Sequence, residues 1–69
     1  MPKFQIVTTD NITYTEGASP LGVFADLGVG GAVLENFRYE PGYVVLKYSD
    51  DLELRIPEHR IKYIAKRFS

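Results

Sequence analysis

The stretch that decides the fold is residues 32–64, AVLENFRYEPGYVVLKYSDDLELRIPEHRIKYI, in which three apolar segments are separated by two turn signals. Glu40-Pro41-Gly42 is the first signal and Ser49-Asp50-Asp51 is the second, and both are rich in typical turn residues. Within each segment, apolar and polar side chains alternate with the period of a β-strand. The stretch therefore predicts a three-stranded antiparallel meander over residues 32–56.

The alternation also assigns each side chain of the meander to a face. Leu52, Leu54 and Ile56 alternate with charged residues, so we expect this apolar set to face the core. The opposite, outer face is then expected to carry Arg38, Tyr43, Val45, Lys47, Glu53 and Arg55.

The N-terminal segment, residues 3–15, predicts a β-hairpin. Alternation runs up to Thr8, Asp10-Asn11 supplies a turn, and alternation resumes at Ile12. The side chains expected to point inward are Phe4, Ile6, Ile12 and Tyr14.

Residues 20–27 predict a short helix. Ser19 precedes Pro20, an arrangement favoured at a helix start, and Leu21, Phe24 and Leu27 follow at helical spacing. The glycine-rich segment 28–31 follows this helix and precedes a strand. A phosphate-binding loop has the reverse order, so the glycines indicate a connector.

The C-terminal segment, residues 57–68, has two interpretations. Ile61, Ile64, Ala65 and Phe68 fall on one side of a possible helix, whereas the β-branched and aromatic residues 61–64 would equally suit a short strand. Periodicity alone does not decide between a turn followed by a strand and a helix.

Residues 56–64, IPEHRIKYI, following a meander, resemble the closing segment of small SH3-like and Sm-like β-barrels. In those domains a single helical turn after the proline leads into a last short strand. The resemblance implies a barrel-like shape and a turn plus strand at the C-terminus. It carries over no binding residue, because the glycine and asparagine signatures of Sm RNA-binding loops are missing and a hairpin replaces the leading helix.

Taken together, these segments predict one small, mainly β (α+β) domain spanning residues 1–69. Its elements are expected in the order β-β-α-β-β-β, with an antiparallel sheet curled into a partly open small barrel and a short C-terminal strand or helix. Sixty-nine residues supply a modest core, and such short chains often depend on disulfides, a metal or a second subunit. Cysteine is absent, so self-association is the expected remedy and a cytoplasmic location is the default.

Charge is unevenly distributed along the chain. The formal net charge is −1, and all nine acidic side chains lie within residues 1–58. Half of the eight basic side chains lie in residues 59–69, namely Arg60, Lys62, Lys66 and Arg67. This C-terminal patch is suited to an acidic partner, to a polyanion or to the acidic face of the same domain.

No residue cluster demands a particular chemistry, so we expect a non-enzymatic protein without cofactor or metal. His59 is the single histidine, and its neighbour Glu58 would not face it on a strand or a helix. Asp50-Asp51 could hold a cation, but an acidic pair in a hairpin turn is usually solvated, so the turn is the better explanation.

Binding is the better-supported class of function. Aromatic and apolar side chains on an outer sheet face suit a protein interface or a homo-oligomer, which is the first hypothesis. Rings beside cations also suit single-stranded nucleic acid, which is the second. In either case the predicted partner-binding residues are Arg38, Tyr43, Val45, Lys47, Arg55, Arg60, Lys62, Lys66 and Arg67.

Overall fold

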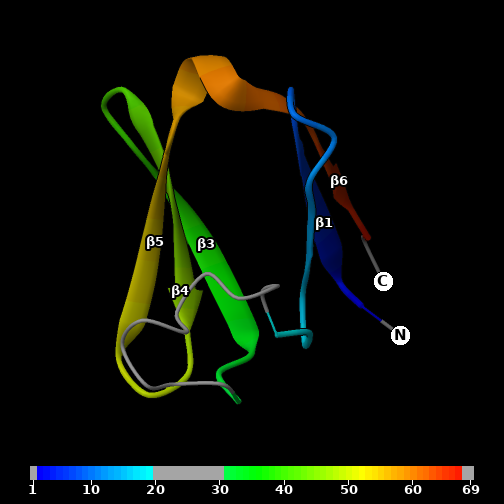
Figure 1. The fold of residues 1–69 in the computed structure, drawn as a ribbon, viewed down its shortest axis with the longest axis vertical. Helices are drawn as coiled ribbons and strands as arrows, with labels where there is room; N and C mark the ends of the chain where they lie inside the picture. Colours follow the sequence, from blue (N-terminus) through cyan, green and yellow to red (C-terminus); the bar gives the residue numbers. More distant parts are fainter. Residues whose placement is uncertain (1, 20–30, 68–69) are drawn as a thin grey trace.

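The computed structural model of the chain describes residues 2–19 and 31–67, which form two antiparallel sheets of three strands each (Figure 1). The first sheet has the order β2-β1-β6 and consists of β1 (Phe4–Thr8), β2 (Thr13–Thr15) and β6 (Ile61–Lys66). The second has the order β3-β4-β5 and consists of β3 (Leu34–Glu40), β4 (Tyr43–Tyr48) and β5 (Leu52–Pro57). A short 3₁₀ helix, η2 (Glu58–Arg60), connects β5 to β6. The prediction of a mainly β chain is confirmed.

The N-terminal hairpin forms where the sequence predicts it. β1 and β2 pair antiparallel, with Ile6 opposite Tyr14. The turn is held by the Thr8 N–H, which donates to the Ile12 carbonyl at 3.0 Å, and Asn11 occupies the left-handed region with φ of 64°. Asparagine adopts that conformation more readily than most residues, which is why Asp10-Asn11 makes a turn.

The predicted meander is also present. Glu40 lies opposite Tyr43, and Gly42 takes a φ of +82° in the two-residue turn between them. Asp50 and Asp51 both have positive φ in the second turn, a conformation that Asp tolerates. A bulge between Leu34 and Asn36 shifts the register of β3 on β4 at its start.

The C-terminal segment is a turn followed by a strand, so the helical alternative is wrong for residues 57–66. Pro57 leads into η2, and β6 then pairs antiparallel with β1, with Ile64 opposite Ile6. The Thr9 N–H donates to the Arg60 carbonyl and the Arg67 N–H to the Lys3 carbonyl, both at 2.8 Å. The edge of β1 supplies a hydrogen-bonding partner, and this tertiary pairing overrides the helical spacing of the apolar residues.

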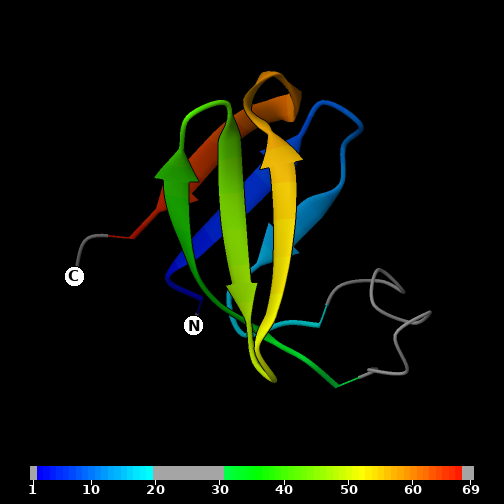
Figure 2. The same cartoon turned by 90° about the vertical axis from the view of Figure 1, so that its left-hand side faces the viewer.

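The expectation of one sheet curled into a partly open barrel is not confirmed. The described strands form two separate sheets that do not close into a barrel, and Figure 2 shows their strands crossing obliquely. The reason is that η2 redirects the chain away from the second sheet, so that the last strand is added to β1 and extends the first sheet. The helix predicted at 20–27 lies outside the described residues, and the predicted element order is therefore not confirmed either.

The core fills the space between the two sheets. It consists of the buried side chains of Phe4, Ile6, Ala32, Leu34, Val44, Leu46, Tyr48 and Ile56. Tyr14, Leu52 and Leu54 are partly buried against this cluster, which agrees with the prediction that their side chains point inward. Ile12 differs from the prediction, since 45% of it is exposed. It precedes β2, which begins at Thr13, and so lies outside the alternation of the ladder.

Shortening a side chain at the centre of this core should lower stability. We expect Ile6→Val to reduce the free energy of unfolding by about 1 kcal/mol, because Ile6 is fully buried and the lost methylene leaves a cavity. Urea denaturation measures this change. Ile12→Val makes the same chemical change at an exposed position and should alter stability by less than about 0.5 kcal/mol. Equal losses for the two variants would contradict the assignment of the core.

The buried tyrosine of the core predicts a loss of stability at alkaline pH. Burial, followed by the charge of Tyr14, raises the pKa of Tyr48 to about 12. The unfolded chain loses this proton near pH 10. The contribution of Tyr48 is therefore complete below about pH 10 and is lost as the pH rises towards 12. Tyr48→Phe should reduce the alkaline loss in urea denaturation, whereas Tyr43→Phe, at an exposed position, should leave it unchanged.

Candidate functional site

The outer face of the second sheet carries the residues that the alternation assigned to it. The register places Arg38 opposite Val45, and Val45 opposite Arg55, so these three form one row across the sheet. Lys47 pairs with Glu53 in the next row, and Tyr43 pairs with Glu40 at the other end. The predicted outer face of the meander is therefore confirmed as a set of residues on one side of the sheet.

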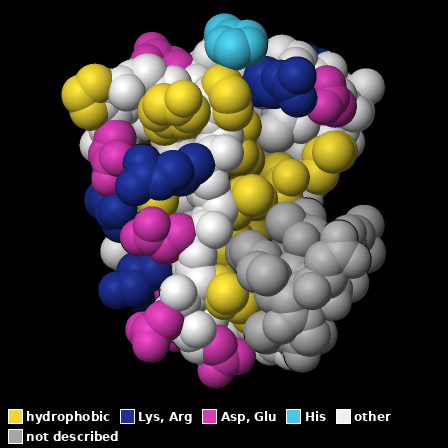
Figure 3. Space-filling model, turned by 60° about the vertical axis from the view of Figure 1, so that its left-hand side comes forward, with side chains coloured by type: hydrophobic (Ala, Val, Ile, Leu, Met, Phe, Trp, Pro, Cys, Tyr) yellow, Lys and Arg dark blue, Asp and Glu magenta, His cyan; other side chains and the backbone are white. Residues whose placement is uncertain are grey.

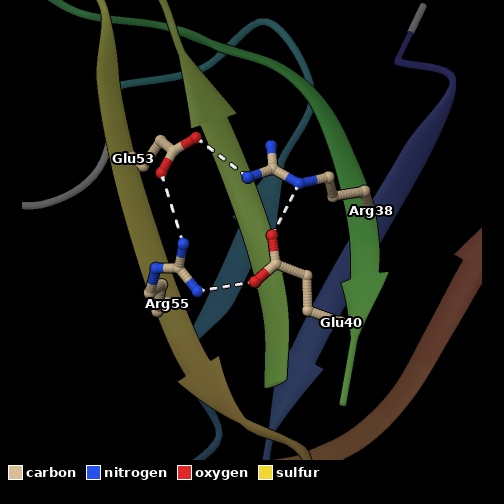
Figure 4. A network of polar contacts seen from close by, with 4 residues as sticks. All are labelled: Arg38, Glu40, Glu53 and Arg55. Atoms are coloured by element: carbon tan, nitrogen blue, oxygen red, sulfur yellow. Dashed lines mark hydrogen bonds and ion pairs between the residues drawn. The ribbon is translucent and has the colours of Figure 1, made fainter. Parts of the chain in front are cut away.

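Four charged side chains on this face form a closed network (Figure 4). Arg38 Nε lies 2.9 Å from Glu40 Oε2, and Arg38 Nη2 lies 3.1 Å from Glu53 Oε1. Arg55 Nη1 lies 2.7 Å from Glu40 Oε1, and Arg55 Nη2 lies 3.9 Å from Glu53 Oε2. We call these four residues the charge ring. Each arginine contacts both glutamates, so positive and negative side chains alternate around it.

The charge ring covers the side chain of Val45. Val45 is 0% exposed, although it lies on the outer face and is not part of the core cluster. Arg38 and Arg55 flank it from the two neighbouring strands, and their long side chains extend over the smaller one between them. Val45, which was predicted to contact a partner, is therefore buried in this structure.

The charge ring also neutralises the two arginines that the nucleic-acid hypothesis required. Hydrogen bonds from Arg55 and then Arg38 lower the pKa of the Glu40 carboxyl. Hydrogen bonds to Glu40 and then Glu53 raise the pKa of Arg38. Figure 3 shows basic and acidic side chains interleaved over this part of the surface. The charge ring is thus balanced in charge, and its paired arginines make it a poor surface for phosphates.

The remaining predicted partner-binding residues do not extend this face. Tyr43 and Lys47 are exposed on it, but Arg60 lies in η2 and lines a small pocket of 150 Å³ with Arg55. Lys62 is exposed on β6. Lys66 and Arg67 lie at the end of β6, beside a different surface. The structure therefore divides the predicted set among separate places.

That different surface is a groove between β3 and the end of the first sheet. Its volume is 420 Å³, and it is lined by Lys3, Phe4, Glu35, Asn36, Phe37, Tyr39, Lys66 and Arg67. We call it the β3–β6 groove. An adjoining pocket of 320 Å³ shares Lys3, Phe4, Lys66 and Arg67 with it. The two hollows therefore share three basic side chains along one border.

Three aromatic side chains, Phe4, Phe37 and Tyr39, line the β3–β6 groove. Phe37 packs edge-on against Phe4 with ring centroids 4.7 Å apart, and against Tyr39 with centroids 5.8 Å apart. Lys66 Nζ lies 5.4 Å from the centroid of Phe37, within the range of a cation–π contact. Tyr39 is 69% exposed, more than any other large hydrophobic residue of the described chain. The groove thus presents an open ring beside basic groups.

The sequence contained part of the signal for this groove. Alternation already placed Phe37 and Tyr39 on one face of their strand and predicted that Phe4 points inward. Sequence patterns could not predict that β3 lies close to β1 and β6. Among the described residues these strands form no ladder with β3, and only the packing of the two sheets brings them together. Lys3 and Asn36 were not predicted as site residues for the same reason.

Residues 2–19 and 31–67 contain no candidate metal site. Within those ranges, no three histidine or acidic side chains gather closely enough to hold a metal ion. The described ranges also hold no helix with the length and apolar character needed to cross a membrane. Neither a family model, nor a curated protein sequence, nor a solved structure matches the chain. Function is therefore inferred from the geometry of its own residues.

The charge ring predicts a dependence of stability on acidic pH. The pKa of Glu40 is lowered in the folded state, so its contribution is complete above the pKa of an unfolded glutamate, about 4.3. That contribution is lost as the pH falls through the lower, folded value. Glu40→Gln should lower the free energy of unfolding at neutral pH. It should also reduce the further loss of that free energy on acidification, as measured by urea denaturation at neutral pH and at a pH below about 4.3. Glu58→Gln, at an exposed carboxylate outside the charge ring, should show the wild-type dependence.

Proposed function

We propose that this chain is a small, non-enzymatic protein-interaction module that binds its partner, or a second copy of itself, in the β3–β6 groove. The observation that supports the proposal is an exposed aromatic side chain, Tyr39, on an edge strand beside a hollow of 420 Å³. Tyrosine is enriched at protein interfaces because its ring buries apolar area while its hydroxyl keeps a polar partner.

The position of β3 at the edge of its sheet supports the same proposal. In the order β3-β4-β5, one side of β3 pairs with β4. On its other side, the Phe37 N–H donates to the side chain of its own neighbour, Asn36 Oδ1, at 2.8 Å. Within residues 2–19 and 31–67 no other strand pairs with this side of β3, and an unpaired strand edge is a template for pairing with a partner chain.

Single-stranded nucleic acid is the second candidate, and one observation favours it. Tyr39 offers an open ring near Lys3, Lys66 and Arg67, a combination that can stack a base and contact phosphates. The charge ring and Phe37 weigh against it. Arg38 and Arg55 are already paired with carboxylates, and Phe37 is contacted by other rings and by Lys66. One open ring gives little stacking, so protein binding is the better proposal.

The composition supports a cytoplasmic location as part of the same proposal. The chain contains no cysteine, which suits a reducing compartment. A small core also suits a protein that gains stability from a partner. A partner that binds only the folded state shifts the folding equilibrium towards the folded state.

Site-specific photo-cross-linking in the native host tests the proposal. With a photoreactive phenylalanine analogue at position 39, we expect adducts that protease removes and nuclease does not. The matched control places the same analogue at position 47, where Lys47 is exposed on the outer face of the second sheet. It should give few adducts. Adducts removed by nuclease, or equal adducts at the two positions, would contradict the proposal.

A further inference from the structure

We infer that the partner segment is an acidic, extended peptide that adds a strand to the edge of β3 and directs its carboxylates at Lys3 and Lys66. This inference rests on the proposed function and specifies the chemistry of its partner. It combines three observations about the β3–β6 groove: the direction of the backbone groups of β3, the sign of the charges across the groove, and the way in which the rings are already packed.

The backbone groups of β3 alternate in direction, and the hydrogen bonds show which ones point away from β4. The Phe37 N–H points outward, because it bonds to Asn36 Oδ1. The groups of Tyr39, two residues on, share that direction. Nearer the start of β3, the outward groups of Leu34 are engaged by Gly17 and Ala18, at 2.7 and 3.0 Å. Pairing by an incoming strand is therefore directed to Phe37 and Tyr39, where its carbonyl oxygen would replace the Asn36 side chain.

A strand added at this edge would alternate its side chains between two environments. On one side its neighbours would be Phe37 and Tyr39, and its side chains would enter the β3–β6 groove. On the other side its neighbours would be Arg38 and Glu40, which already contact each other at 2.9 Å. The specificity of binding therefore depends on the side chains that enter the groove.

The charges around the groove favour acidic side chains there. Three basic residues line it against one acidic residue, Glu35. Neither Lys3 nor Lys66 forms an ion pair with any part of the chain that the structure describes. The chain as a whole carries a net charge of −1, so this basic border is a local feature and not a general one. Complementary charge at a partly enclosed surface contributes both affinity and choice of partner.

The packing of the rings favours a peptide over a nucleic acid strand. Phe37 contacts Phe4, Tyr39 and Lys66, which leaves Tyr39 as the exposed ring of this cluster. Outward backbone groups on an edge strand suit the regular N–H and carbonyl groups of a peptide, and a nucleic acid backbone has no equivalent pattern. The same groove therefore binds a strand-forming peptide with more hydrogen bonds than it offers to an oligonucleotide.

Fluorescence anisotropy with defined probes tests this inference. The probe is a labelled peptide in which glutamate alternates with threonine, so that all carboxylates fall on one face of a strand. We expect it to bind, and to bind more weakly as salt rises. A peptide with lysine in place of glutamate should not bind. The acidic peptide with alternate backbone nitrogens methylated should also fail to bind, because it cannot pair with β3.

Matched variants locate the binding site. Lys3→Glu and Lys66→Glu change exposed side chains of the groove, and each should weaken binding roughly fivefold, the effect of about 1 kcal/mol from replacing an attractive with a repulsive contact. Lys47→Glu makes the same charge change on the outer sheet face and should leave the affinity unchanged. Circular dichroism of all three checks that the fold is retained.

Several outcomes would overturn the inference. Equal binding of the methylated peptide would exclude strand addition, and a loss with Lys47→Glu alone would place the site on the outer sheet face. Tighter binding of a single-stranded oligonucleotide of the same charge would assign the groove to nucleic acid. If no acidic peptide binds while the cross-link from position 39 still captures a protein, the proposed function stands and the acidic strand is wrong.

Discussion

The pairing of β6 with β1 is the constraint on which the rest of this structure depends. It joins a strand near the start of the chain to one near its end, with Ile6 opposite Ile64 and the Arg67 N–H bonded to the Lys3 carbonyl. This pairing completes the three-stranded first sheet and gives the second sheet an apolar surface to pack on. It also sets the direction in which the last residues of β6 leave the sheet. Lys66 consequently lies over the ring of Phe37 and on the border of the groove.

Charged side chains pair with one another on the outer face of the second sheet, whereas two lysines at the opening between the sheets do not form ion pairs within the described residues. On the outer face of the second sheet, Arg38, Glu40, Glu53 and Arg55 pair with one another around the buried Val45. At the opening between the sheets, Lys3 and Lys66 project beside aromatic rings, with Glu35 as the acidic residue of the same lining. Exposed ion pairs contribute little to stability individually, so the significance of the charge ring lies in removing two arginines from the set available to a partner. Lys3 and Lys66, at the groove, remain in that set.

Local sequence patterns predicted most of the strands. They did not predict the features that depend on contacts between distant segments. Proline, glycine and aspartate at the turns specified the meander, and alternation placed Arg38, Val45 and Arg55 on one face. Alternation did not show that Val45 would be covered, because that depends on how two arginines from neighbouring strands reach across it. Alternation also did not distinguish a helix from a strand after Pro57, because the strand is stabilised by pairing with the edge of β1. The β3–β6 groove lies between segments more than 25 residues apart in the chain, and periodicity within one segment contains no information about such a meeting.

The two hydrogen bonds between Leu34 and residues 17 and 18 set the length of any ladder that can form on β3. They occupy the beginning of the strand, and the turn at Pro41-Gly42 ends it, so an added strand has room for only a few backbone bonds. A ladder of a few backbone bonds would give a small interface, and small interfaces are typical of complexes that dissociate quickly. The proposed strand addition would therefore give a complex that forms and dissociates repeatedly, not a permanent one.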